Sequence, residues 1–317
     1  MKAAVVHAFD APPRFAEFRE PVAGANEVVV EVKAAALSNL VRILAAGKHP
    51  AAVPPPFVPG VDGVGTVDGR RVYFAFPSPP CGSMAELTAV PRGQCVAVPD
   101  GVSDITVAAA ANPGMSSWAS LTRRARLVRG ESVLVNGGTG AAGRLAIQVA
   151  KHLGARRVVA TARSAAAQAE LRALGADAVI VLPGSQAELI ELFRRELREH
   201  GIDVVLDYLF GNTAEAFLHA CIGPGRGAAE PRVRFVQIGT MAGPTISLPA
   251  VALRSSGVEM LGTGLGSVSH AELVACIGEF FASYEAAGFR IAATSAALSD
   301  VESAWGATVK ERLVLVV

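Results

Sequence analysis

Two patterns of apolar residues divide the chain into parts that predict different folds. From about residue 118 onward, short apolar runs alternate with stretches in which apolar residues recur every three or four positions. This alternation is typical of strands followed by helices, and it predicts a parallel, doubly wound sheet with right-handed crossovers. The expected strands of this part are 133–135, 157–162, 178–182, 204–208, 234–239 and 258–262.

The first part of the chain, residues 1 to about 115, lacks this alternation. Strands are expected at 2–8 and 28–35, where apolar residues favour extended structure. A helix over 37–46 should end at Gly47, and the Asp68-Gly69 pair predicts a tight hairpin turn. This part is therefore expected to be a β-rich domain.

The end of the chain leaves the α/β pattern and finishes in an apolar strand at 313–317. We expect it to return to the first domain. The predicted domains are then 1–115 with 288–317, and 116–287, with the second inserted into the first and a ligand cleft between them.

A glycine-rich turn lies between the first strand and the first helix of the α/β part. Glycines recur there at every third residue, after the apolar run 133–135 and before a segment with helical periodicity. A turn without side chains lets a pyrophosphate approach the backbone, and the helix N-terminus presents free N–H groups to its charge. The pattern predicts a dinucleotide site with the candidate residues Gly137, Thr139, Gly140, Ala141, Ala142 and Gly143.

The end of the next strand indicates which dinucleotide is bound. An NAD-preferring site usually has Asp or Glu about 20 residues after the glycines. This chain has Arg163-Ser164 there, and its next carboxylate is Glu170. Because guanidinium pairs well with phosphate oxygens, Arg163 and Ser164 favour the 2′-phosphate of NADPH over NADH. The alternative interpretation is that Arg163 is a solvated surface arginine.

Composition narrows the choice of partners and compartment. A formal net charge of +1 implies no nucleic-acid partner. No apolar run reaches membrane-spanning length, and the N-terminus lacks a signal-peptide pattern, so no membrane association is expected. The cysteines stand singly and form no CxxC pair, which favours a cytoplasmic protein.

Several motifs resemble those of the medium-chain dehydrogenase/reductase superfamily, in the family's order along nearly the whole chain. The matching segments are 59–67, 112–118, the glycine turn, 203–207 and Ile238-Gly239. The zinc-free quinone oxidoreductase-like branch fits best. The resemblance implies an α/β fold with a GroES-like β-rich catalytic domain plus a Rossmann domain that has a doubly wound parallel sheet. It also implies a homodimer formed through the Rossmann sheets.

The positions that hold zinc in metal-dependent relatives carry other residues here. By the matching motifs they are Ser38, Val61 and Asn112, and none of them is a usual zinc ligand. No metal is therefore expected. Without a Lewis acid the carbonyl of a simple aldehyde is poorly polarised. Conjugated acceptors suit the site better, because hydride addition to an enone or quinone spreads charge through the π-system.

His49 is the candidate proton donor. Related enone and enoyl-thioester reductases have a Tyr after the early helix, and this chain has His49 in that place. Histidine can donate a proton near neutral pH. The alternative is an exposed loop histidine. By the resemblance, Ser38 and Asn39 would line the substrate side, with helix capping as their alternative role.

The resemblance implies further cofactor contacts. Asn112 and Ser116 would lie near the nicotinamide or its ribose, unless they cap the helix that follows. Tyr208 follows a strand at the carboxyl edge, where ligands bind in such sheets, and a buried core tyrosine is the alternative.

Three more positions complete the predicted cofactor site. Gly239 is the last residue of the fifth expected strand of the α/β part, and Gly264 belongs to the glycine-rich segment 261–266, which in relatives also contributes to the dimer edge. Arg312 precedes the terminal strand, where it would reach the cofactor phosphate or be solvated.

These observations predict a zinc-independent, NADPH-dependent oxidoreductase that reduces quinones or α,β-unsaturated carbonyl compounds by hydride transfer. The alternative is a protein that keeps the NADPH site for sensing or for structure, with slow or no catalysis. A short-chain dehydrogenase is excluded, because no Tyr is followed by Lys four residues later.

Overall fold

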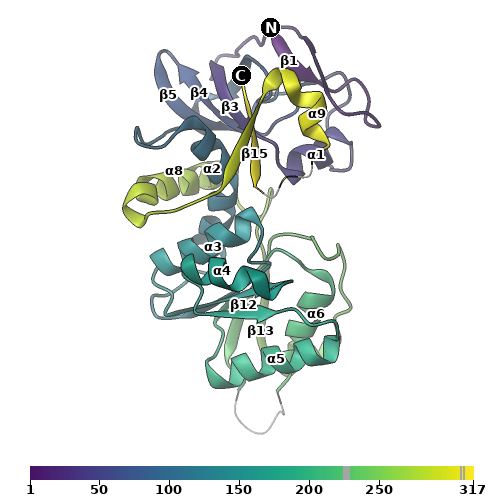
Figure 1. The fold of residues 1–317 in the computed structure, drawn as a ribbon, viewed down its shortest axis with the longest axis vertical. Helices are drawn as coiled ribbons and strands as arrows, with labels where there is room; N and C mark the ends of the chain where they lie inside the picture. The colour runs from purple at the N-terminus through teal and green to yellow at the C-terminus, as the bar shows by residue number, and fades with distance from the viewer. Residues whose placement is uncertain (224–228, 308, 310) are drawn as a thin grey trace. The chain divides into compact units, whose positions relative to one another are not determined.

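The structure is a computed structural model that describes residues 1–223, 229–307, 309 and 311–317. The chain forms two compact units: unit 1 contains Met1–Asn112 and His270–Val317, and unit 2 contains Pro113–Ser269 (Figure 1). The boundaries expected from the sequence fall at 115/116 and 287/288. In the structure both boundaries lie earlier, at 112/113 and 269/270. The second differs more, because helix α8 (His270–Ala287) packs against β7 (Cys95–Ala97) within unit 1.

Unit 1 is the β-rich part. Its seven-stranded sheet has the order β14-β15-β3-β4-β5-β7, with β6 also paired to β3, and β1 and β2 form a separate two-stranded sheet. The C-terminal strand β15 pairs antiparallel with β3 and parallel with β14. The elements not yet given are β1 (Lys2–Val5), β2 (Arg14–Glu17), β3 (Glu27–Ala36), α1 (Asn39–Ala45), β4 (Asp62–Val67), β5 (Arg70–Ala75), β6 (Leu87–Pro91), η1 (Arg92–Gln94), β14 (Ala293–Ala297), η4 (Leu298–Asp300), α9 (Val301–Trp305) and β15 (Arg312–Val316).

Local sequence explains two features of unit 1. Along most of β3 every second residue is buried, because one face of the strand packs on the core. β4 and β5 form the predicted hairpin, in which Asp68 and Gly69 have φ angles of 49° and 73°. Two successive positive φ angles are typical of the type I′ turn that joins twisted strands, so the hairpin prediction is confirmed.

Unit 2 is the α/β part. Its six-stranded sheet has the order β10-β9-β8-β11-β12-β13, and every pair of neighbouring strands is parallel. The elements are β8 (Ser132–Asn136), α3 (Ala141–His152), β9 (Arg157–Ala162), η3 (Ala165–Ala167), α4 (Gln168–Ala173), β10 (Ala178–Val181), α5 (Gln186–Glu199), β11 (Val204–Asp207), α6 (Gly211–Ala220), β12 (Arg232–Gln237), α7 (Ala250–Arg254) and β13 (Gly257–Gly262).

The strand order of unit 2 determines where a ligand would bind. Counted along the chain, the strands lie in the order 3-2-1-4-5-6, which is the order of doubly wound dinucleotide-binding sheets. The order reverses between β8 and β11, and ligands of such sheets bind outside the carboxyl ends of the strands at that point. The predicted combination of a doubly wound parallel sheet with a β-rich part is confirmed.

Helix α2 (Asp104–Ala119) corrects one expectation about capping. Asn112 and Ser116 lie inside this helix and do not cap it; the Ser103 hydroxyl accepts a hydrogen bond from the Thr106 amide (3.2 Å) near its start. The helix continues through Pro113, because the apolar residues that precede this proline are fully buried. Its end passes into a π-helical turn, η2 (Ser120–Arg124). Among the described residues, no helix has both the length and the apolar character needed to cross a lipid bilayer.

Candidate functional site

The glycine turn of unit 2 joins β8 to α3, and its geometry requires glycine at some of these positions but not at all of them. Gly137 has a φ of 101°, a conformation that favours glycine. A Cβ on Gly143 would lie 2.2 Å from the Gly137 carbonyl oxygen, so the turn closes only with glycine there. A Cβ on Gly140 would meet nothing closer than 3.9 Å, so the fold itself does not require this glycine.

The start of α3 leaves backbone donors available. Gly140 is the N-cap residue and supplies no side-chain hydrogen bond. The amides of Ala141, Ala142 and Gly143 in the first helical turn have no intrahelical acceptor, because the residues four positions earlier precede the helix. Free donors at a helix N-terminus beside open space are an arrangement that can bind an anion. Thr139 lies in the same turn.

A buried polar network lies directly beneath the glycine turn, and no pattern in the sequence indicates it. Asn136, Thr161 and Asp207 end β8, β9 and β11 or lie next to their ends, and Thr213 belongs to α6. The Asn136 amide Nδ2 donates to Asp207 Oδ1 (2.8 Å) and to Thr213 Oγ1 (3.1 Å). The Thr161 hydroxyl donates to Asn136 Oδ1 (2.8 Å) and accepts from the Gly137 amide (2.8 Å).

Asp207 carries the charge of this network. Burial raises the pKa of its carboxyl, and hydrogen bonds from the Phe210 amide, the Asn136 side chain and the Leu209 amide oppose the rise. The side chain is fully buried, so the ionised form depends on these donors. A single sequence lacks a signal for the network, because its members become neighbours only through the strand order.

Arg163 and Ser164 follow β9 at the same edge of the sheet. Arg163 is exposed and forms no hydrogen bond or ion pair with the described residues, so its guanidinium is available for a ligand. The Ser164 hydroxyl accepts a hydrogen bond from the Ala166 amide (3.2 Å). Glu170 pairs with Arg144 through Nε and Oε1 at 2.8 Å, so the next carboxylate of the chain is already engaged.

Tyr208, Gly239 and Gly264 follow β11, β12 and β13, so the structure brings them to the same carboxyl edge as the glycine turn. No described residue forms a hydrogen bond of normal geometry with the buried Tyr208 hydroxyl. Burial raises the pKa of this phenol, and the nearby Ser116 hydroxyl counteracts part of the rise. A Cβ on Gly239 would lie 2.6 Å from the Tyr208 carbonyl oxygen, so glycine permits the close approach of the two loops.

Ser38, Asn39 and His49 lie in unit 1 around helix α1. Ser38 is buried and its hydroxyl accepts from the Val41 amide (3.1 Å), so the capping role considered for it is observed. Asn39 is the first residue of α1. The Ala51 amide donates to His49 Nδ1 (3.1 Å), so in this arrangement the imidazole proton resides on Nε2.

Arg312 belongs to a buried charged cluster of unit 1 that includes two residues not singled out from the sequence, Asp62 and Tyr73. The Tyr73 hydroxyl donates to Asp62 Oδ2 (2.8 Å). Burial raises the pKa of Asp62 to about 6, although the Tyr73 hydrogen bond and the charge of Arg312 both lower it. Asp62 Oδ1 and the Nε and Nη2 atoms of Arg312 are buried and have no hydrogen-bond partner among the described residues.

The three positions that correspond to zinc ligands in metal-dependent relatives do not form a usual zinc site. Val61 has no donor atom, and the Ser38 hydroxyl already caps α1. In the described part of the chain, no group of three or more His, Cys, Asp or Glu side chains is placed to hold a metal ion. All four cysteines are free.

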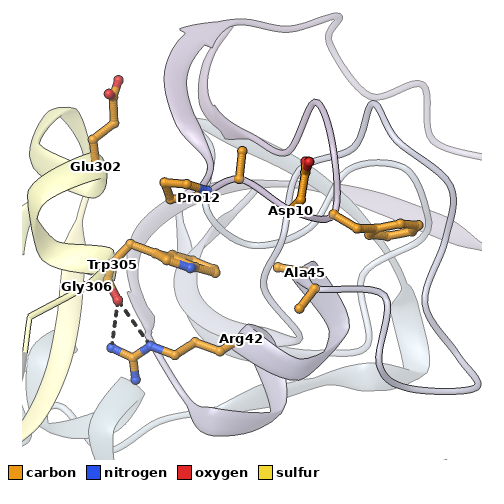
Figure 2. A pocket seen from close by; sticks show the side chains of 10 residues that line it. Asp10, Pro12, Arg42, Ala45, Glu302, Trp305 and Gly306 are labelled. Atoms are coloured by element: carbon orange, nitrogen blue, oxygen red, sulfur yellow. Dashed lines mark hydrogen bonds between the residues drawn. The ribbon is translucent and has the colours of Figure 1, made fainter.

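Unit 1 also has a surface cavity of about 370 Å³ between the loop after β1 and helices α1 and α9 (Figure 2). The Trp305 indole extends between Pro12 and the Arg42 stem. The Arg42 guanidinium donates two hydrogen bonds to the Trp305 carbonyl, from Nε (3.3 Å) and Nη2 (3.2 Å). None of the site residues predicted from the sequence lines this cavity, and its arginine is already bonded within the protein.

Comparison with known proteins gives consistent relationships. The family model described as zinc-binding dehydrogenase matches residues 141–281. A probable NADPH-dependent quinone reductase of Emericella nidulans is 29% identical over 356 residues, which cover 96% of this chain and 96% of that protein. The quinone oxidoreductase of Thermus thermophilus, solved also in complex with NADPH, is 29% identical with a TM-score of 0.81 over 100% of both chains.

Another relative is matched over a smaller share of its length. A trans-enoyl reductase of Aspergillus terreus is 34% identical over 172 residues, or 44% of this chain. The match spans 48% of that reductase, so about half of its length has no counterpart in the alignment.

Proposed function

We propose that this chain, which belongs to the quinone oxidoreductase-like branch of the medium-chain dehydrogenase/reductase superfamily, is an NADPH-dependent reductase of quinones or α,β-unsaturated carbonyl compounds. The observation that carries the proposal is the glycine turn with open space at Gly140, followed at the same sheet edge by Arg163, which has no partner within the described ranges of the chain. NADP(H) binding and oxidoreductase activity are properties of its relatives.

The glycine turn fits the pyrophosphate of a dinucleotide. Gly137 and Gly143 are required by the closure of the turn, whereas Gly140 is not. A glycine that the fold does not need is explained if a ligand occupies the space that a side chain would fill. The free amides of Ala141, Ala142 and Gly143 would then donate to the phosphate oxygens, where the helix dipole favours negative charge.

Arg163 and Ser164 would hold the adenosine 2′-phosphate. The exposed Arg163 guanidinium forms no ion pair with the described residues, and Glu170, the next carboxylate of the chain, pairs with Arg144. Phosphate and guanidinium form strong charge-assisted hydrogen bonds, so this pair selects NADPH over NADH.

The remaining predicted contacts orient the rest of the cofactor. Tyr208, whose buried hydroxyl has no partner of normal geometry among the described residues, would donate to the ligand. We assign the nicotinamide and its ribose to Asn112, Ser116, Gly239 and Gly264, and a phosphate contact to Arg312. When bound, the reduced nicotinamide supplies the hydride.

The protein must also supply or relay a proton to the reduced acceptor. We assign this role to His49, whose Nε2 carries the proton while the Ala51 amide occupies Nδ1. Ser38 and Asn39 would contact the acceptor from helix α1. The Ser38 hydroxyl accepts from the Val41 amide, so its own proton remains available for donation.

The residues at the three positions that correspond to zinc ligands indicate which kind of substrate accepts the hydride. Ser38, Val61 and Asn112 do not fit a catalytic zinc ion, so no carbonyl activation by zinc is derived. A conjugated acceptor delocalises the charge that hydride addition creates and needs less electrophilic help. The names of two relatives, a quinone reductase and a trans-enoyl reductase, support acceptors of this kind.

We further propose that the protein is a homodimer formed through the sheet of unit 2. β13 is the terminal strand of that sheet, and it exposes Met260, at 37% relative accessibility, in the middle of the strand. An open strand edge readily pairs with another chain. Light scattering of the purified protein would test the mass, and a monomer at micromolar concentration would contradict this assembly.

The direct test measures cofactor binding and turnover together. NADPH and NADH would be titrated by fluorescence, and the loss of reduced nicotinamide absorbance would be followed with a panel of quinones, enones and enoyl thioesters. We expect tight NADPH binding and turnover with at least one conjugated acceptor. Tight NADPH binding without turnover on any acceptor would favour the sensing or structural role instead.

An Arg163→Ala variant separates the preference for NADPH over NADH from dinucleotide binding itself. It should weaken NADPH binding by about tenfold to hundredfold, as expected for the loss of a charge-assisted phosphate contact, and leave NADH binding unchanged. Arg172→Ala is a matched control, because Arg172 is an exposed arginine of α4 that donates to the Asp177 carbonyl. Equal losses for both nucleotides in Arg163→Ala would contradict the 2′-phosphate assignment.

A further inference from the structure

We propose that the buried network of Asn136, Thr161, Asp207 and Thr213 is a positioning device that holds the glycine turn in its pyrophosphate-binding shape, with Thr161 as the residue that acts on the turn. The inference rests on the proposed cofactor site. It adds residues that do not touch the ligand but determine which backbone amides remain available to it.

The hydrogen bonds of the network run in one direction only. The Asp207 carboxylate can only accept, so the Asn136 amide must turn its Nδ2 toward it and its Oδ1 toward Thr161. The Thr161 hydroxyl therefore donates to Asn136 Oδ1, and its lone pair accepts from the Gly137 amide. The buried charge of Asp207 thus orients a chain of donors that ends at the first glycine of the turn.

This arrangement divides the amides of the turn into two groups. The Gly137 amide donates to Thr161 Oγ1 (2.8 Å), and the Gly138 amide donates to the Thr161 carbonyl (3.0 Å). Both are therefore occupied within the protein. The donors at the start of α3 have no acceptor four residues earlier within the helix, and the two bonds from the turn to Thr161 fix the backbone that leads into them, so they stay directed at a ligand.

The same carboxylate also holds the neighbouring loop after β11. Asp207 Oδ1 and Oδ2 accept from the Phe210 amide (both 3.1 Å), and Oδ1 accepts from the Leu209 amide (3.1 Å). Phe210 has a φ of 57°, an unfavourable value for a residue with a side chain, and these bonds keep it there. Atoms of Leu209 and Tyr208 lie 3.1 Å and 3.3 Å from the position of a Cβ on Gly137, so this loop forms one wall of the turn.

The location of the network favours positioning over simple core packing. Asn136 and Asp207 are paired neighbours on β8 and β11, the two strands between which the strand order reverses. Apolar side chains could fill the same volume without the desolvation of a carboxylate. A charged, fully bonded cluster at the ligand edge is expected if its directionality has a use.

The test compares two substitutions of Thr161 in the full-length protein. Thr161→Val keeps the shape but loses the hydroxyl, and Thr161→Ser keeps the hydroxyl. We expect Thr161→Val to weaken NADPH and NADH binding by the same factor, about tenfold, because both share the pyrophosphate. Thr161→Ser should bind both within about twofold of the wild type. Arg163→Ala, by contrast, should affect NADPH alone.

Thr88→Val controls for the generic loss of a buried threonine hydroxyl. Thr88 is fully buried in unit 1, and its hydroxyl donates to the Cys81 carbonyl (2.6 Å). The Thr88→Val variant should have a lower melting temperature than the wild type and the same nucleotide affinity. If Thr161→Val does not fold, Asp207→Asn serves instead. This substitution keeps the side-chain volume but replaces one acceptor with a donor. It should weaken the binding of NADPH and of NADH by the same factor.

Two results would overturn the inference while leaving the proposed function intact. One is a folded Thr161→Val protein that binds NADPH as tightly as the wild type. If Thr161→Val does not fold, the same result in folded Asp207→Asn counts instead. The other is Thr161→Ser binding as weakly as Thr161→Val, which would show that the hydroxyl is not the relevant group. A wild-type protein that binds neither nucleotide would instead reject the proposed function, and with it this role of the network.

Discussion

The buried carboxyl of Asp62 should make unit 1 less stable as the pH rises from acidic to neutral. Asp62 is 3% exposed, and its Oδ1 atom has no hydrogen-bond partner among the described residues. Burial is the largest influence on this group, and it disfavours the charged form despite the Tyr73 hydrogen bond and the nearby Arg312. The pKa of Asp62 is therefore raised from 3.8 to about 6.

The sign follows from proton binding in the two states. Between these pKa values the folded protein holds the Asp62 proton and the unfolded chain releases it, so the free energy of unfolding falls as the pH rises. The stabilisation is fully present below the unfolded pKa and is lost as the pH rises through about 6. Each pKa unit corresponds to about 1.4 kcal/mol, which gives about 3 kcal/mol in total. About 2 kcal/mol of this falls between about pH 4.5 and about pH 7.5.

The assay uses Asp62→Asn, which keeps the acceptor for Tyr73 but does not titrate. Urea unfolding would be followed by the fluorescence of Trp305 in a Trp118→Phe background, because the chain has two tryptophans and Trp118 lies in unit 2. Between about pH 4.5 and about pH 7.5, the free energy of unfolding of the parent Trp118→Phe protein should fall by about 2 kcal/mol more than that of its Asp62→Asn variant.

Asp10→Asn provides the control for this experiment, because Asp10 is an exposed carboxylate of the same unit. It should retain the pH dependence of the parent protein. Identical pH dependence in Asp62→Asn and its parent would refute the reasoning, because Asp62 would then titrate alike in the folded and unfolded chains. A larger loss in Asp62→Asn would refute it as well.

Two other sites give equally specific expectations. Gly140→Ala should leave the melting temperature within about 2 °C of the wild type but weaken NADPH binding, because the new Cβ would enter the space proposed for the ligand and contact no protein atom closely. Gly143→Ala should lower both the melting temperature and NADPH affinity, since its Cβ would lie 2.2 Å from the Gly137 carbonyl oxygen; two variants with the same melting temperature would contradict this distinction. His49→Ala should reduce kcat by about a hundredfold and leave NADPH affinity unchanged if His49 is the proton donor, and an unchanged kcat with every good acceptor would remove that role.

Features that depend on neighbouring residues could be predicted from the sequence. The glycine spacing at 137–143 predicts the tight turn and the helix after it, because both are local structures that depend on neighbouring residues. The Asp68-Gly69 hairpin is confirmed for the same reason. Helix α2 shows the limit of local rules. A proline usually ends or kinks a helix, yet α2 continues through Pro113, because burial of the preceding apolar segment outweighs one missing hydrogen bond.

Features that depend on the order of strands could not be predicted in this way. Asn136 and Asp207 are 71 residues apart, and nothing in either segment indicates that β8 and β11 are neighbours. Asp62 likewise acquires its raised pKa from burial in a sheet that contains β15, the last strand of the chain. Without a fold, each of these aspartates looks like an exposed residue near a strand end. A buried polar side chain becomes interpretable only when its partners are known, because the same carboxylate is costly without donors and directional with them.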